Sequence, residues 1–312
     1  YIDAAAEVGA DAVKFQTHIA HAESTIAEPF RVPFSYEDDT RYAYWRRMEF
    51  TADQWRGLAD HARDKGLVFL SSPFSVEAVD LLDDIGMAAW KIASGEVGNP
   101  LLMERILKTG KPVLLSSGLS GMGDLRAAAD EVRRAGCGLA MFQCTSQYPV
   151  PLDKVGLNVL GDMAREFVCP VGLSDHSGTP YPALAAMAQG AHMLEIHLTF
   201  DPRMFGPDSR SSLDIQAFSE VRRARDAFHT MMSNPMDKEA HAQAQSGMRD
   251  IFTRSLALRR DMRAGETVTR ADFALKKPGT GLGAGLLEEY TGRRLAHDVP
   301  ADKLLEDSDF AS

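Results

Sequence analysis

Short runs of apolar and β-branched residues alternate along the chain with segments in which apolar residues recur every three or four positions. The runs cover 12–17, 67–72, 89–94, 112–117, 139–146, 171–176 and 193–199. The segments between them, such as 76–86, 99–110 and 123–136, have helical spacing and end in glycine. Near-continuous apolar strands that alternate with helices are typical of parallel sheets covered on both faces. The pattern therefore predicts an α/β fold built from parallel βα units.

The number of strands favours a (β/α)8 TIM barrel. Seven runs are present, and a helical pattern at 2–8 comes before the first of them without a strand of its own. One strand ahead of Tyr1 would give the eight that close such a barrel. Because the chain also opens without an initiating Met, we expect that upstream sequence is missing and that the barrel lacks its first strand in this chain. An open doubly wound sheet is the alternative, but no GxGxxG turn supports a dinucleotide site.

The connection 18–50 is unusually long and is rich in aromatic and arginine residues. It ends at a predicted helix start, where Thr51 and Gln54 form a capping box and Phe50 and Trp55 are placed to pack together. A loop of this length on the active face of a barrel is typical of a lid or a subunit contact.

The composition changes after residue 228. Residues 229–247 lack a strong apolar period and are interpreted as a linker, and 248–312 contain short β-like pieces, a cap at Thr269 to Asp272 and a PGTGLG turn. The sequence therefore predicts a catalytic barrel over 1–228, a linker over 229–247 and a small α+β domain over 248–312. A domain of about 60 residues has a marginal core, so we expect it to dock on another surface.

Composition narrows the class of protein. The chain of 312 residues is 45% apolar and 25% charged, which is usual for a globular protein. No segment resembles a membrane span or a signal peptide, and three widely spaced cysteines form neither a disulfide framework nor a zinc knuckle. The net charge of −10 argues against a nucleic-acid partner. We expect a cytoplasmic protein without a membrane or nucleic-acid partner.

Polar side chains gather where the predicted strands end. Active sites of TIM barrels lie at this end of the strands. The polar residues at the ends of the seven runs are Lys14, Gln16, Ser71, Ser72, Lys91, Ser94, Glu96, Ser116, Ser117, Gln143, Thr145, Ser146, Ser174, Asp175, His176, Glu195 and His197. We expect them to line one site.

His176 and His197 end consecutive strands, so their imidazoles can converge on one ion. Water and substrate oxygens would complete the coordination, which favours Mn²⁺, Co²⁺ or Mg²⁺ acting as a Lewis acid. The alternative is that each histidine only forms hydrogen bonds.

Lys14 and Lys91 also end strands, where a buried ammonium group is costly without an anion. They could form ion pairs with Glu96 or Glu195. They could also clamp a carboxylate and a phosphate with help from the surrounding serine hydroxyls, or one of them could form a Schiff base as in an aldolase. Asp208 follows a Gly-Pro turn beyond the last strand, where it could cap the turn or bind a substrate.

Seven motifs, in this order, resemble the sialic acid (nonulosonic acid) synthases. They are VKFQTH, KIASGE, LLSSG, QCTSQYPVP, GLSDHSG, LEIHLTFD and GPDSRSSLD. The tail resembles the C-terminal antifreeze-like, or SAF, domain of that family, so the similarity covers nearly the whole chain. Seven colinear motifs are far more specific than any one of them.

The resemblance implies that phosphoenolpyruvate condenses with an N-acetylmannosamine-like hexose to give a nine-carbon α-keto acid and phosphate. It assigns His176 and His197 to a divalent metal, and it places Glu96 near the reacting centre together with the catalytic lysines. The residues that match phosphoenolpyruvate ligands are Lys14, Ser72, Lys91, Ser94, Ser116, Ser146 and Ser174. Those that match sugar contacts are Gln16, Tyr148, Glu195 and Asp208. In the family a domain-swapped homodimer brings a further sugar contact, here Lys277, from the partner subunit.

This chain departs from the family pattern at several positions. An AEIGxNH-like first strand, whose glutamate contacts the sugar, is absent. Ser146 stands where some members have Asn, and Lys277 stands where a KRPG-like motif has Arg, which replaces a planar fork with a point charge. Phe205 is bulkier than the residue expected there. A Schiff-base pyruvate aldolase and a catalytically degenerate carbohydrate-binding relative are the alternatives. Acceptors related to N-acetylmannosamine, to the precursors of legionaminic or pseudaminic acid, or to mannose all fit the sequence.

Overall fold

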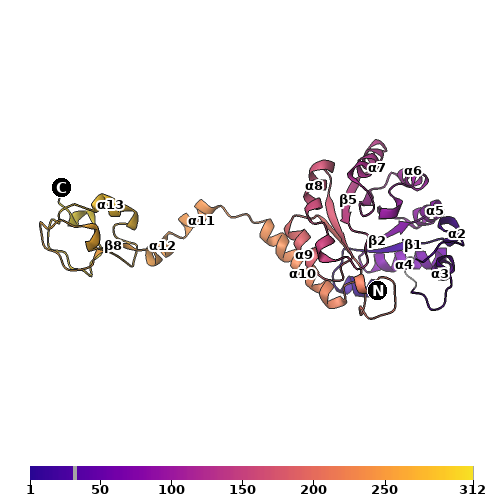
Figure 1. Cartoon of the computed structure of the whole chain (residues 1–312), viewed down its shortest axis with the longest axis horizontal. Coiled ribbons are helices and arrows are strands. Elements are labelled where there is room, and N and C mark those ends of the chain that lie inside the picture. Colours follow the sequence, from indigo (N-terminus) through magenta and orange to yellow (C-terminus); the bar gives the residue numbers. More distant parts are fainter. Residues whose placement is uncertain (31–33, 312) are drawn as a thin grey trace. The chain divides into compact units, whose positions relative to one another are not determined.

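Seven parallel strands with helices around them form the first of two units (Figure 1). The structure is a computed structural model that describes residues 1–30 and 34–311, and it divides into the units Tyr1–Ser233 and Asn234–Ser312. The strands are β1 (Ala12–Thr17), β2 (Val68–Pro73), β3 (Trp90–Ile92), β4 (Val113–Ser116), β5 (Leu139–Cys144), β6 (Val171–Asp175) and β7 (Met193–Ile196). The helices are α1 (Ile2–Glu7), α2 (Ala20–Glu23), α3 (Arg41–Met48), α4 (Ala52–Asp64), α5 (Val76–Ile85), α6 (Pro100–Leu107), α7 (Met122–Arg134), α8 (Asn158–Phe167), α9 (Tyr181–Ala188) and α10 (Ile215–Met232).

Successive side chains of each strand point to opposite faces of the sheet, so one face packs in the apolar core and the other carries polar groups. Trp90 and Ile92 of β3 and Leu115 of β4 are buried in a core that also holds helix residues such as Leu82 and Phe167. Side chains one position away, as at Lys91, point to the opposite face of the sheet. This arrangement explains why short strands that are buried along their length still carry polar groups.

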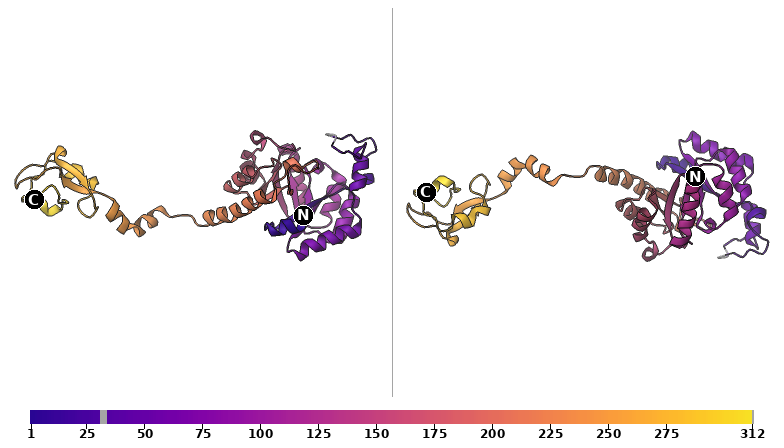
Figure 2. Two further views of the ribbon diagram at one scale, coloured as in Figure 1. Left: turned by 90° about the horizontal axis from the view of Figure 1, so that it is seen from below. Right: turned by 90° about the horizontal axis from the view of Figure 1, so that it is seen from above.

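The sheet curls, but its described strands do not close into a ring. Hydrogen bonds link β1 to β2 and, separately, β3 through β7 in sequence order. An ion pair between Lys14 of β1 and Glu195 of β7 bridges the two outer strands. Every residue of β7 is only partly buried, whereas β3 and β6 are buried throughout. The first unit is therefore a curled set of parallel strands, with hydrogen-bonded pairing interrupted between β2 and β3 and between β7 and β1. Figure 2 shows the ribbon from two further sides.

The long connection after β1 carries α2 and α3 and leads into α4, and residues 31–33 of the predicted connection 18–50 lie outside the described residues. The predicted capping box is confirmed: the Thr51 amide donates to Gln54 Oε1 at 2.7 Å, and the Gln54 amide donates to Thr51 Oγ1 at 3.3 Å. The rings of Phe50 and Trp55 lie 5.3 Å apart between centroids.

The second unit is small and mostly irregular. Its elements are α11 (Lys238–Ala244), α12 (Ser246–Phe252), β8 (Ser255–Leu258), β9 (Phe273–Lys276) and α13 (Leu287–Tyr290). Strands β8 and β9 are antiparallel, and the predicted cap is present because Thr269 donates from its amide and hydroxyl to Asp272. The segment interpreted as a linker, 229–247, contains the last residues of α10 and the whole of α11. Residues 231–240 are exposed throughout. Among the described residues, no helix is both long and apolar enough to span a membrane.

Candidate active site

One carboxylate is shared by two lysines inside the curled sheet. Lys91 Nζ lies 3.2 Å from Glu195 Oε2, and Lys14 Nζ lies 3.4 Å from Glu195 Oε1. Lys91 Nζ also donates to Ser116 Oγ at 2.5 Å. The Lys91 side chain is 4% exposed and that of Glu195 is 17% exposed. The ion pairs with Glu195, which the sequence analysis gave as one alternative for Lys14 and Lys91, are thus present. Two ammonium groups share a single carboxylate.

The pKa values at this cluster follow from burial and from these neighbours. Burial raises the pKa of Glu195, but Lys91, Lys14 and then His197 outweigh it and bring the pKa to about 2. Burial lowers the pKa of Lys91, and Glu195 only partly opposes this. A buried cluster with an excess of positive charge is suited to an anionic ligand.

Two of the predicted serines converge on the backbone of Gly118. The Gly118 amide donates to Ser94 Oγ at 3.0 Å. A Cβ atom on Gly118 would lie 2.3 Å from Ser146 Oγ and 2.7 Å from Ser94 Oγ, so only glycine leaves room for both hydroxyls. Ser72 is in register with Gln16, and Ser174 is in register with Glu195; both serines are buried. Ser116 is the predicted serine whose hydroxyl contacts Lys91 directly within the described residues, and Ser72 and Ser174 lie on the strands that pair with those of Lys14 and Glu195.

His176 and His197 lie side by side at the ends of β6 and β7. Their ring centroids are 5.0 Å apart. His176 Nε2 is 3.2 Å from the hydroxyl of Tyr148 and 3.4 Å from Cys144 Sγ, and His176 Nδ1 is buried without a hydrogen-bond partner among the described residues. Burial, and then His197, lower the pKa of His176 to about 3. Burial also lowers the pKa of His197, although Asp208 opposes this.

These two rings fit a divalent metal with few protein ligands. Metal binding needs neutral imidazoles, and the lowered pKa values keep both rings neutral near pH 7. His176 Nδ1 is buried without a hydrogen-bond partner among the described residues, and in the tautomer that carries its proton on Nε2 this nitrogen could bind a metal. Within the described ranges, no group of three or more His, Cys, Asp and Glu side chains could hold a metal ion. A metal held by two histidines would keep open positions for substrate oxygens.

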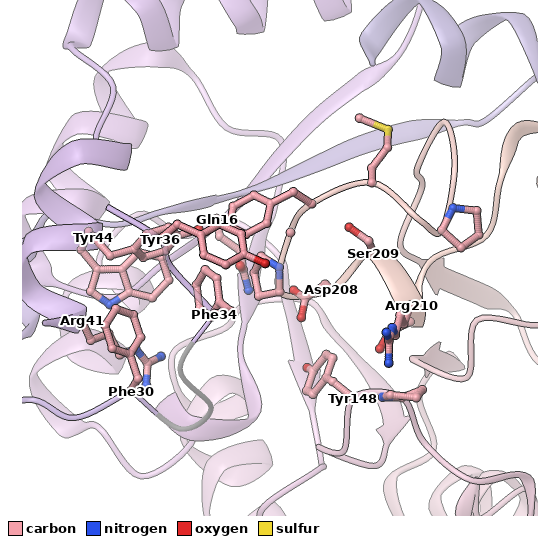
Figure 3. Close-up of a pocket in the computed structure, with 18 of the residues that line it drawn as sticks. Gln16, Phe30, Phe34, Tyr36, Arg41, Tyr44, Tyr148, Asp208, Ser209 and Arg210 are labelled. Atoms are coloured by element: carbon pink, nitrogen blue, oxygen red, sulfur yellow. The ribbon is translucent and has the colours of Figure 1, made fainter. Parts of the chain in front are cut away.

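A cavity of about 890 Å³ is lined by three of the five predicted sugar contacts, Gln16, Tyr148 and Asp208 (Figure 3). The Asp208 turn is held rigidly, because the amide of Ser211 and the hydroxyl of Ser212 both donate to the Asp208 carbonyl, at 2.9 and 2.8 Å. Glu195, a further predicted sugar contact, forms ion pairs with both lysines, and its contact with a sugar stays a prediction.

Glu96 forms no hydrogen bond or ion pair with this cluster within the described residues. Glu96 ends a 3₁₀ turn after β3, and its Oε2 accepts a hydrogen bond from Asn99 Nδ2 at 2.8 Å. Lys277 belongs to the second unit, where its Nζ lies 5.1 Å from the centre of the Phe252 ring. Their predicted roles stay predictions.

The sequence did not single out most of the aromatic lining of the cavity. Phe30, Phe34, Tyr36 and Tyr44 come from the connection after β1, and Phe205 comes from the loop after β7. The aromatic content of the connection was visible in the sequence, but the meeting of the two loops depends on the fold.

His18 is a second feature that the sequence left without a role. Its ring is stacked between the rings of Trp45 and Phe74, with centroid distances of 3.7 and 4.3 Å. Its Nδ1 is 2.6 Å from Glu23 Oε1. The polar character of the segment KFQTH at the end of β1 is the only signal that could have indicated it.

Comparison with known proteins agrees with this geometry. Residues 1–236 match the NeuB family, and residues 253–311 match the SAF domain. The N,N'-diacetyllegionaminic acid synthase of Campylobacter jejuni is 30% identical over 312 residues, which cover 98% of this chain and 93% of the relative. The N,N'-diacetyllegionaminic acid synthase of Legionella pneumophila is 31% identical, with 97% of this chain and 86% of the relative covered.

A solved structure shows the same fold. The N-acetylneuraminic acid (sialic acid) synthetase of Leptospira borgpetersenii, in complex with citrate, aligns with a TM-score of 0.69 at 24% identity, covering 80% of this chain and 84% of that chain. Because the family match spans residues 1–236 of 312, the chain belongs to the NeuB family of phosphoenolpyruvate-dependent nonulosonic acid synthases and carries a C-terminal SAF domain.

Proposed function

We propose that this enzyme condenses phosphoenolpyruvate with an N-acylated hexose related to N-acetylmannosamine, giving a nine-carbon α-keto acid and phosphate. The observation that carries the proposal is the cluster in which Lys14 and Lys91 share Glu195 beside the paired rings of His176 and His197. Phosphoenolpyruvate has one carboxylate and one phosphate, about −2.5 to −3 in charge near pH 7. The two ammonium groups, with the hydroxyls of the nearby serines, are suited to bind it.

We propose that the acceptor binds in the cavity, whose Tyr148 hydroxyl is 3.2 Å from His176 Nε2. Gln16, Tyr148 and Asp208 offer hydrogen bonds to the sugar. His176 and His197 would hold a divalent metal, which when bound would polarise the aldehyde of the open-chain sugar. Holding both substrates in contact converts a bimolecular reaction into an effectively unimolecular one.

The bonds then change in a fixed order. C3 of phosphoenolpyruvate forms a bond to the aldehyde carbon, and C2 becomes an oxocarbenium centre. Water adds to C2, and the C2–O bond to phosphate breaks, so that one water is consumed for each phosphate released. In this proposal Glu195 keeps the lysines in place during these steps through its two ion pairs. Glu96 remains our candidate for a group close to the reacting centre.

Phosphate release provides the test. We expect release only when phosphoenolpyruvate, an N-acylated hexose and Mn²⁺, Co²⁺ or Mg²⁺ are all present, and loss of turnover in His176→Ala and His197→Ala. Release that continues without sugar, or in the presence of a chelator, would contradict the proposal. The lowered pKa of Lys91 favours one competitor, a Schiff-base aldolase. Trapping a pyruvate adduct with borohydride in the presence of chelator would identify it.

We further propose that an eighth strand completes the barrel between β7 and β1. The ring of Tyr1 lies 4.5 Å from that of Phe200, which follows β7. A strand that ended ahead of Tyr1 would therefore finish at the same end of the sheet as β7, parallel to both neighbours.

The domain limits 1–228, 229–247 and 248–312 are also part of the proposed function, and the two compact units support a division near them. The domain-swapped homodimer stays a prediction, which light scattering would test.

A further inference from the structure

Cys144 brings a thiol into the site, and the proposed function gives this thiol no task. Cys144 is the last residue of β5 and is 6% exposed. Its Sγ borders the same space as a predicted phosphoenolpyruvate ligand, because a Cβ atom on Gly118 would lie 3.1 Å from Cys144 Sγ and 2.7 Å from Ser94 Oγ. The thiol therefore lies among the groups proposed to bind the substrate, although no step of the reaction uses it.

The thiol is paired with a ring nitrogen of His176. Cys144 Sγ is 3.4 Å from His176 Nε2, and both residues are buried. A zinc ion lies about 2.3 Å from a thiolate sulfur and about 2.0–2.1 Å from an imidazole nitrogen, so at a tetrahedral angle it holds the two atoms about 3.5 Å apart. The observed separation of sulfur and nitrogen therefore suits an ion bound by both residues.

An oxygen atom reaches the same nitrogen. The hydroxyl of Tyr148 is 3.2 Å from His176 Nε2, and about 3.3 Å separates an oxygen and a nitrogen that bind one tetrahedral zinc ion at about 2.0 Å each. The pair of Cys144 and His176 is smaller than the groups of three His, Cys, Asp and Glu side chains that are absent from the described ranges. This hydroxyl, or water, would therefore have to complete the coordination.

The thiol determines which ions this position prefers. Thiolate sulfur favours soft and borderline ions such as Cd²⁺ and Zn²⁺, whereas Mg²⁺ and Mn²⁺ suit oxygen ligands. The affinity of a nitrogen ligand already rises from Mn²⁺ to Zn²⁺, and a sulfur ligand beside it increases the difference. Cys144 therefore makes this side of His176 selective for ions other than Mn²⁺ and Mg²⁺.

An ion at this pair would withdraw His176 from the activating ion. A neutral imidazole has one nitrogen that carries a proton and one that can bind an ion. If the activating ion uses Nε2, the two ions compete for one atom. If it uses Nδ1, an ion on Nε2 leaves the proton on Nδ1 and blocks that nitrogen. Both cases lead to inhibition.

We propose that Cys144 Sγ and His176 Nε2 form an inhibitory site for Zn²⁺ and related soft ions, which shares only His176 with the site of the activating ion. The ion binds the thiolate of Cys144, and the thiol proton passes to the solvent. Binding of the ion follows from the contacts of the pair. Inhibition rests on the proposed function, in which His176 holds the activating metal.

Binding is tested with Cd²⁺ as the probe, because a cadmium–thiolate bond absorbs in the ultraviolet. The full-length chain is freed of metal with a chelator and titrated with Cd²⁺. We expect a charge-transfer band in wild type that Cys144→Ser and Cys144→Ala lose. Cys137→Ala is the matched control and should keep the band, because Cys137 is also buried but its Sγ faces the carbonyl of Leu107 at 3.7 Å.

Zn²⁺ should abolish the Cd²⁺ band of wild type by competition. In calorimetry, Cys144→Ser should weaken Zn²⁺ binding by more than the roughly 10- to 100-fold that the loss of an outer-shell partner costs, because a direct ligand is removed. At a fixed Mn²⁺ concentration, Zn²⁺ should lower phosphate release by wild type and by Cys137→Ala.

Three results would overturn the proposal. The first is a Cd²⁺ band that is missing from wild type or unchanged in Cys144→Ser. The second is Zn²⁺ binding to Cys144→Ser as tight as to wild type, which would mean that the thiol only forms a hydrogen bond to His176. The third is phosphate release that Zn²⁺ does not lower although it occupies the pair. If no metal supports phosphate release, the proposed function fails, while the two binding measurements still decide whether the pair holds an ion.

Discussion

Replacing Glu195 with glutamine removes the carboxylate that Lys14 and Lys91 share. The side chain keeps its shape, but both ammonium groups lose their counter-ion at 3.4 and 3.2 Å. Breaking a buried pair by removing one partner is destabilising because the other charge stays buried. We therefore expect Glu195→Gln to lower the free energy of unfolding of the first unit at pH 7.

The magnitude follows from the pKa of Glu195. It falls from 4.5 to about 2 in the folded chain, a difference of about 2.5 units at about 1.4 kcal/mol each, which gives about 3 kcal/mol. Coulomb's law at 3.2 Å, with an effective dielectric constant of about 20, gives about 5 kcal/mol per pair before the cost of burial. The two figures agree in scale. For a unit of this size the loss corresponds to about 6–12 °C in Tm.

The effect has a defined pH dependence. Because the folded pKa is below the unfolded one, the stabilisation by Glu195 is complete above pH 4.5 and is lost as the pH falls toward 2. Scanning calorimetry of wild type and Glu195→Gln between pH 7 and pH 3.5 should show a Tm difference that narrows below pH 4.5. Glu104→Gln is the control, since its pair with Lys108 is 64–66% exposed and contributes little. A variant that melts within about 2 °C of wild type at pH 7, or a difference that does not change with pH, would refute this reasoning.

Three further predictions concern single sites. Gly118→Ala should weaken phosphoenolpyruvate binding in calorimetry while the chain stays folded, because its Cβ would displace the hydroxyls near Gly118, whereas Gly123→Ala, with nothing within 4 Å, should bind normally. Asp309→Ala should lower the Tm of the second unit, because Asp309 is fully buried and accepts from Lys303 and from the Glu306 amide, and an unchanged second transition would contradict this. Thr51→Ala should destabilise the first unit by about 1 kcal/mol through loss of the helix cap, measured by urea unfolding, and a loss well below about 0.5 kcal/mol would argue against the capping box.

The sequence predicted the strands well because their signal is local. The first strand was predicted at 12–17 and lies at Ala12–Thr17. The last was predicted to reach 199 but ends at Ile196, because Leu198 forms only an isolated bridge with Leu213. The bridge of Leu198 depends on Leu213, which lies outside 193–199, so the pattern of apolar residues within 193–199 could not predict it.

The site was predictable where it depends on strand ends, and less so where it depends on loops. His176 and His197 were expected to meet because parallel strands bring their carboxyl ends together, and their rings are 5.0 Å apart. The contact between Tyr36 and Phe205 joins two connections that are far apart in the chain. Ring contacts of this kind have no spacing rule in a sequence, so this part of the cavity lining became visible only in three dimensions.

The charged cluster of the site and the aromatic lining of the cavity differ in what holds them, and this has an evolutionary consequence. Lys14, Lys91 and Glu195 are fixed by strands whose replacement would disturb the core. Phe34, Tyr36 and Phe205 are carried by two connections that touch through these rings. Under the proposed function, in which the acceptor binds in this cavity, substitutions in these connections would change which sugar is accepted at little cost in stability. Diversification of the acceptor within one ancestral reaction would then proceed through residues such as 34, 36 and 205, while the enol-phosphate half of the chemistry is inherited unaltered.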